Sequence, residues 1–128
     1  MDSVTAPRAL IVDDNFYNRD LCALVLKRTG YAVQQAENGQ QALDLLRSQA
    51  FDLLVLDLAM PVMDGVTVMR NLRSEKISEQ TFVIIITANP HMVFHPEFDV
   101  DYIINKPMDI VAFEQLVVRL KSKSNTAD

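Results

Sequence analysis

The stretch LLVLDLAMPVMDG, Leu53 to Gly65, decides the fold, because four consecutive apolar residues run straight into Asp57. An apolar run without alternation is typical of a strand buried on both faces, as in a parallel sheet. A carboxylate is costly to remove from water unless it is paired or bound to a metal. An acid at the end of such a strand is therefore solvated, unless charged groups from other segments meet it there.

Size and composition limit what the protein can be. The 128 residues, 49% of them hydrophobic, suffice for one domain with a single core. The net charge of -5 argues against direct nucleic-acid binding, which requires a basic surface. The single cysteine, Cys22, fits a helical core position, and the start MDSVTAPR lacks the apolar core of a signal peptide. Because no apolar run approaches the roughly 20 residues of a membrane span, we expect a cytoplasmic protein that contacts no membrane.

Apolar runs and helical periods alternate along the chain. The apolar runs predict central strands at 9–12, 53–56 and 82–86, and weaker edge strands at 31–36 and 102–104. Strands that alternate with helices form a parallel sheet with right-handed crossovers. The sequence therefore predicts a doubly wound α/β domain with a five-stranded parallel sheet.

The helical periods lie between these strands. The first places Leu21, Leu24 and Val25 on one face, after a cap-like Asn15 and before Gly30. The residues that carry the other periods are Ala42, Leu45 and Leu46; Val68 and Leu72 after Asp64; and, after a cap-like Asp109, Phe113, Leu116, Val117 and Leu120.

Polar residues stand where the predicted strands end, the edge at which doubly wound sheets bind ligands. They are Asp13, Asp14, Asp57, Thr87 and Lys106. A solvated strand end explains any one of them, but not easily three acids, a hydroxyl and a lysine together. Two carboxylates roughly 4 Å apart repel by about 4 kcal/mol at an effective dielectric near 20, which a divalent cation relieves. All-oxygen ligands indicate Mg²⁺, Mn²⁺ or Ca²⁺, and so few protein ligands suit Mg²⁺ beside water or phosphate.

Four ordered motifs resemble those of the receiver domain of two-component response regulators. They are VDDN (12–15), LDLAMPVMDG (56–65), IIITA (84–88) and NKP (105–107). The resemblance covers residues 8–121, and DDNFYNRDL and AENGQQALDLL look most like receivers of hybrid histidine kinases. It implies a flavodoxin-like, CheY-like fold with strand order 2-1-3-4-5, an N-terminal extension at 1–7 and a flexible tail at 122–128.

The resemblance also implies roles for the strand-end residues. Asp57 would accept a phosphoryl group from a histidine kinase or a histidine phosphotransfer domain, Lys106 would bind that group, and Thr87 would swing toward it. Lys106-Pro107 would be a cis peptide. The implied Mg²⁺ ligands are Asp14, Asp57 and the carbonyl of Ala59, with Asp13 acting through water. The residues alone do not decide which of the three acids is the nucleophile.

By the same resemblance the protein is a signalling phosphoacceptor and not an enzyme. It would assist its own phosphorylation and dephosphorylation and switch a partner-binding surface, through homodimer formation or an unnamed effector. The alternative is a phosphorylation-independent interaction module with the same fold. A hydrolase of the haloacid dehalogenase type needs a second acid where Ala59 stands, and the glycines, at 30, 39 and 65, form no dinucleotide-binding loop.

Several positions depart from the family pattern. Ala59 and Asn89 stand where side chains usually tune the access of water to the phosphoryl group. Ile103 stands where many receivers carry an aromatic switch residue, and Tyr102, one residue earlier, faces the other way unless the strand has a bulge.

The segment 89–101 departs most. Pro90 and Pro96 leave room for only a short or irregular fourth helix, because a proline inside a helix costs about 3 kcal/mol. His91 and His95 in this segment are interpreted as loop residues and not as metal ligands, since a third ligand is lacking.

Overall fold

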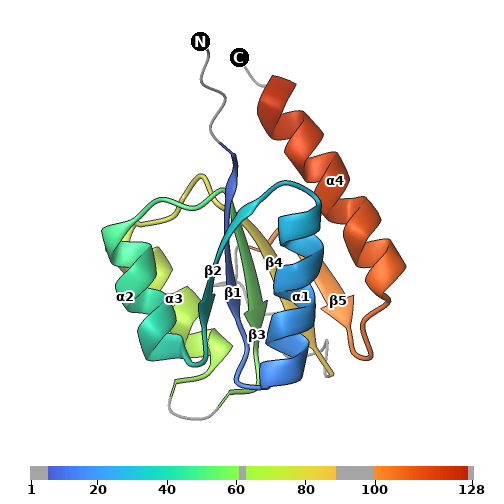
Figure 1. Cartoon of the computed structure of the whole chain (residues 1–128). Helices are drawn as coiled ribbons and strands as arrows, with labels where there is room; N and C mark the ends of the chain where they lie inside the picture. Colours follow the sequence, from blue (N-terminus) through green and yellow to red (C-terminus); the bar gives the residue numbers. More distant parts are fainter. Residues whose placement is uncertain (1–5, 61–62, 89–99, 127–128) are drawn as a thin grey trace.

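The computed structural model describes residues 6–60, 63–88 and 100–126. This part of the chain forms a parallel sheet with the order β2-β1-β3-β4-β5 (Figure 1). Its strands are β1 (Arg8–Val12), β2 (Ala32–Ala36), β3 (Leu53–Asp57), β4 (Phe82–Thr87) and β5 (Tyr102–Asn105). The predicted fold class and strand order are both confirmed.

Helices cover both faces of the sheet. Helices α2 (Gly39–Ser48) and α3 (Gly65–Glu75) lie on one face, and α1 (Phe16–Arg28) and α4 (Ile110–Thr126) lie on the other (Figure 1). The first three begin after a residue whose side chain accepts a hydrogen bond from a first-turn amide, and these caps are Asn15, Asn38 and Asp64. The helical backbone of α4 continues into the segment 122–128 that was expected to be a tail.

Two apolar layers, one on each face of the sheet, form the core. Leu54 and Leu56 of β3 belong to the layer beneath α2 and α3, whereas Leu53 and Val55 belong to the layer beneath α1 and α4. Burying each such side chain stabilises the fold by roughly 1.5–3 kcal/mol, and all residues of β3 are buried. The strand is therefore fixed in the middle of the sheet, and Asp57 at its carboxyl end is fixed with it.

The buried face of α1 differs from the predicted one. Leu21 and Leu24 are 41% and 57% exposed, so the prediction that they pack with Val25 is wrong for both. The residues that α1 buries are Cys22, Ala23, Val25 and Leu26. Apolar residues stand on both faces of this helix, so periodicity could not identify the face that packs. The prediction that Cys22 is a core residue is confirmed.

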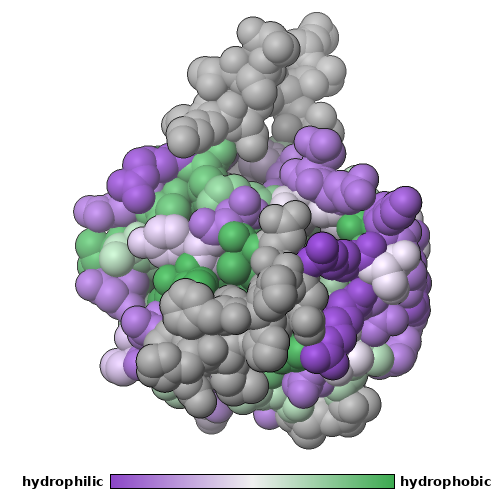
Figure 2. Space-filling view, turned by 180° about the vertical axis from the view of Figure 1, so that it is seen from behind, coloured by the Kyte–Doolittle hydropathy of each residue, from purple (hydrophilic) through white to green (hydrophobic). Residues whose placement is uncertain are grey.

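Strand β5 pairs with β4 without a bulge, because Ile84, Ile85 and Ile86 oppose Tyr102, Ile103 and Ile104 in unbroken register. Ile103 packs into the layer beneath α2 and α3, while Tyr102 is 46% exposed. The aromatic side chain therefore does not occupy the position three residues before Lys106. Figure 2 shows apolar surface on the side where β5 and α4 lie, to the left in this view from behind.

Three further predictions concern residues 89–99, which lie outside the described chain. These are the short or irregular fourth helix, the loop positions of His91 and His95, and the place of Asn89 beside the phosphoryl site. Among the residues that are described, no helix combines the length and the apolar character that crossing a membrane requires.

Candidate functional site

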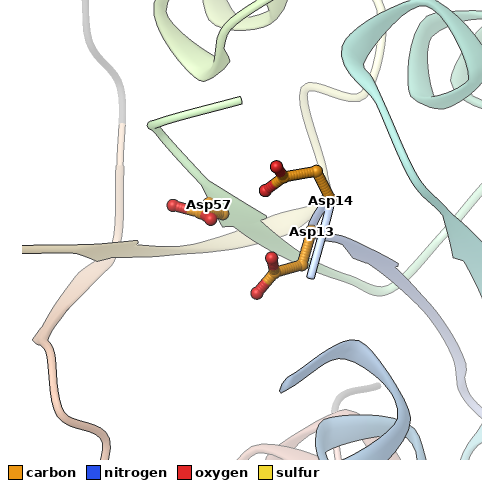
Figure 3. Close-up of side chains that lie close together, drawn as sticks. All are labelled: Asp13, Asp14 and Asp57. Atoms are coloured by element: carbon orange, nitrogen blue, oxygen red, sulfur yellow. The ribbon is translucent and has the colours of Figure 1, made fainter. Parts of the chain in front are cut away.

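The strands all run in one direction, so their carboxyl ends lie together, at the bottom of Figure 1. Asp13 and Asp14 directly follow β1, and Asp57 is the last residue of the neighbouring β3. The three side chains come together beyond these strand ends (Figure 3). One oxygen of each carboxylate lies within 4.8 Å of the others. The convergence of acids that the sequence predicted at this edge is confirmed.

Two of the three acids are withdrawn from water. Asp57 and Asp13 are 2% and 4% exposed, whereas Asp14 is exposed. Burial is the main cause that raises the pKa of Asp13 to about 6; the negative charge of Asp57 also raises it, whereas the hydrogen bond from the Asn15 amide and the charge of Lys106 lower it. Burial and the neighbouring charge of Asp57 thus disfavour the ionised form of Asp13.

Lys106 partly compensates this charge from the other side. Its Nζ lies 3.2 Å from Oδ2 of Asp57, and its side chain is about one third exposed. The Lys106 amide donates to the carbonyl of Thr87 at 3.0 Å, which fixes the residue where β5 ends. The peptide bond between Lys106 and Pro107 is cis, as the resemblance implied.

The opposite oxygen of Asp57 is held by the backbone. The amide of Ala59 donates to Oδ1 of Asp57 at 3.1 Å. With Lys106 on Oδ2, both carboxylate oxygens therefore have a donor. Thr87, which ends β4 beside Asp57, is buried. The sequence-predicted residues of four strand ends thus lie at one edge of the sheet, with Lys106, Asp13 and Asp14 close to the Asp57 carboxylate.

Gly65 allows the next helix to begin against this site. A Cβ at Gly65 would lie 2.8 Å from Cα of Leu58 and 3.0 Å from the carbonyl oxygen of Asp57. The Gly65 amide donates to the carbonyl of Leu58 at 3.0 Å. Asp64, the second acid of the opening stretch, accepts a hydrogen bond from the Thr67 amide at 2.9 Å and so caps α3. The role of its carboxylate in this structure is that of a helix N-cap.

Sequence reasoning missed one residue beside the site. Arg19 of α1 donates through Nη1 to the carbonyl of Asp13 at 2.8 Å, and through Nε to Oε1 of Gln35 at 3.1 Å. A cation early in a helix is unfavourable for the helix dipole. A positive charge at this unfavourable helix position, close in sequence to two acids, was the sequence feature that could have identified Arg19.

A buried carboxylate between a lysine and two further acids, at the carboxyl edge of a doubly wound parallel sheet, defines a class of phosphoryl- and metal-binding α/β domains. A family model described as the response regulator receiver domain matches residues 9–119. The chain belongs to this family. It is a phosphoacceptor domain of two-component signalling.

Known relatives agree with this membership. The transcriptional regulatory protein ResD of Bacillus subtilis is 33% identical over 132 residues, which cover 98% of this chain and 53% of ResD. Sporulation initiation phosphotransferase F of the same species is 42% identical over 81 residues, covering 63% of this chain and 64% of that protein. This chain thus spans between half and two thirds of the length of these two relatives. Neither name supports the finer likeness to hybrid kinases, which stays a prediction.

A solved structure shows the same fold. The response regulator protein TrrA from Thermotoga maritima, in complex with Mg²⁺-BeF, superposes with a TM-score of 0.77 and 30% sequence identity. The match covers 89% of this chain and 98% of TrrA.

Proposed function

We propose that Asp57 is the phosphoacceptor of this domain and that the site takes Mg²⁺ as its cofactor. The observation that carries the proposal is the setting of Asp57, buried at the end of β3, 3.2 Å from Lys106 and clustered with Asp13 and Asp14. One Asp57 oxygen would attack the phosphorus of a phosphohistidine or of a small acyl phosphate. The new bond is O–P, and the bond that breaks is N–P or O–P, its electron pair leaving with the donor.

The residues fit a hard divalent cation. The cluster offers carboxylate oxygens only, which suits Mg²⁺ and not zinc. The raised pKa of Asp13 indicates charge that a cation would compensate. Asp14, Asp57 and the carbonyl of Ala59 would hold the ion, with Asp13 acting through water. When bound, Mg²⁺ neutralises charge on the phosphoryl oxygens.

The remaining residues of the site would position the phosphoryl group and neutralise its charge. Lys106 would follow the transferred group, since its ammonium already lies beside Asp57 and phosphate oxygens suit such a point charge. Thr87 would donate its hydroxyl to the phosphoryl group. The chain would thereby assist its own phosphorylation and dephosphorylation. Its function would be signalling rather than the turnover of a substrate. We assign the receiver domain to residues 8–121. We expect it to lie in the cytoplasm.

The phosphoryl donor would be a histidine kinase or a histidine phosphotransfer domain, as the family membership supports. Direct nucleic-acid binding is not expected of this segment, because its net charge is -5. The rival function, docking without phosphorylation, gains no support from a site in which acids and lysine are all in place.

Labelling with a small donor tests the assignment. Incubation with acetyl phosphate or phosphoramidate and Mg²⁺ should add one phosphoryl group, detected by intact mass. EDTA and Asp57→Asn should each remove the adduct, whereas Asp64→Asn, which changes the acid that caps α3, should keep it. An Asp57→Asn variant that labels like the wild type would sink the assignment.

A further inference from the structure

Arg19 occupies an unusual place for a cation. It lies one turn into α1, where the positive end of the helix dipole disfavours positive charge. Its guanidinium carbon is 5.7 Å from the centre of the Phe16 ring, within range of a cation–π contact. Its two hydrogen bonds lead away from α1, to the carbonyl of Asp13 and to Gln35. The side chain therefore ties three segments together.

The segment that Arg19 reaches carries two of the three acids. Strand β1 ends at Val12, so Asp13 and Asp14 lie beyond its paired residues. The Asp13 amide donates to the carbonyl of Ala36 at 3.2 Å, and the Asp13 carboxylate accepts from the Asn15 amide at 2.9 Å. Arg19 adds the contact to the Asp13 carbonyl. The orientation of the peptide that joins the two acids depends on that bond.

Gln35 supports the guanidinium through its exposed side chain. It lies in β2, paired with Ile11 of β1, so its backbone belongs to the sheet. The planar fork of an arginine can bond two acceptors in a fixed geometry, which a lysine ammonium cannot reproduce. Through its two hydrogen bonds, Arg19 therefore connects the carbonyl of Asp13 to a residue of β2.

We propose that Arg19 is a positioning residue of the acidic site, holding the Asp13 main chain so that Asp13 and Asp14 meet Asp57 around one cation. The proposal rests on the Mg²⁺ site of the proposed function. Arg19 donates to the backbone carbonyl of Asp13 and to Oε1 of Gln35, so its effect on the acids is geometric. Groups that orient metal ligands typically change metal affinity by about 10- to 100-fold when removed.

Calorimetric titration of the unmodified protein with MgCl₂ tests this directly. Arg19→Met keeps the length of the side chain and removes its donors, and it should raise the Kd for Mg²⁺ by about tenfold or more. Arg28→Met is the matched control, because Arg28 lies at the other end of α1 and pairs with Glu114 at 2.9 Å. It should leave the Kd unchanged. Urea unfolding in EDTA then separates loss of metal affinity from loss of stability.

Two milder variants distinguish positioning from charge. Arg19→Lys keeps the charge but not the fork, so its Kd should lie between those of the wild type and Arg19→Met. Gln35→Ala removes the support and should weaken Mg²⁺ binding in the same direction. These two variants also decide the question if Arg19→Met does not fold.

Three results would overturn the role of Arg19. They are an unchanged Kd in Arg19→Met, a wild-type Kd in Arg19→Lys beside a raised one in Arg19→Met, and an equal rise in Arg28→Met. A wild-type protein that binds no Mg²⁺ would instead overturn the metal site of the proposed function, and with it any role in positioning that site.

Discussion

Asp13 carries the clearest electrostatic penalty in the fold, because it is 4% exposed beside a second buried acid. Its folded pKa of about 6 exceeds the ordinary 3.8. A raised carboxyl pKa favours the folded state at low pH, and this contribution fades as the pH rises through about 6. In metal-free protein, Asp13→Asn should therefore stabilise the fold above about pH 7, by roughly 1–3 kcal/mol, and far less near pH 4.

Urea unfolding in EDTA across this pH range measures the effect. The gain from Asp13→Asn should grow between about pH 4 and 6 and level off above that. A gain independent of pH, or a loss of stability near neutral pH, would contradict the electrostatic account. Excess Mg²⁺ should reduce or reverse the gain, because the cation compensates the charge that the asparagine lacks.

At the scale of elements, α1 offers two leucines with opposite surroundings. Leu26 is fully buried between α1 and the sheet, while Leu24 is more than half exposed. Leu26→Ala should lower the free energy of unfolding by about 2–5 kcal/mol, since it leaves a cavity. Leu24→Ala should change it by no more than about 0.5 kcal/mol. Chemical denaturation of the two variants measures both changes in the free energy of unfolding. Equal losses of stability would show that the face of α1 that carries Leu24 is covered and not exposed.

The same helix marks the limit of prediction from sequence. The strands followed from the apolar runs, because a strand buried on both faces has no polar alternation, whereas their order in the sheet followed from the resemblance to receiver domains. The meeting of Asp13, Asp14 and Asp57 followed from topology alone, since parallel strands end at one edge. The packed face of α1 could not be predicted from the sequence, because Leu21 and Leu24 fit a helical period of apolar residues as well as Val25 does. Arg19 did not follow either, because its role depends on side-chain conformation.

At the scale of the whole molecule, the acidic site exists only when the chain is folded. Asp13 and Asp14 follow β1 and Asp57 ends β3, and folding brings their oxygens within 4.8 Å. A ligand that binds only the folded state stabilises it by about 2.7 kcal/mol at 100 times its Kd. The free energy of unfolding should therefore rise with the logarithm of the Mg²⁺ concentration above the Kd.

Thermal or urea unfolding at constant ionic strength tests this linkage, with KCl replacing MgCl₂ to remove general screening of the negative chain. The slope should vanish in Asp57→Asn, which removes a ligand. It should persist in Asp44→Asn, because Asp44 is an exposed acid of α2 outside the cluster. Equal slopes in all three proteins would mean that Mg²⁺ acts on the overall charge. A slope confined to proteins with the intact cluster would mean that folding itself builds the metal site from separate strand ends.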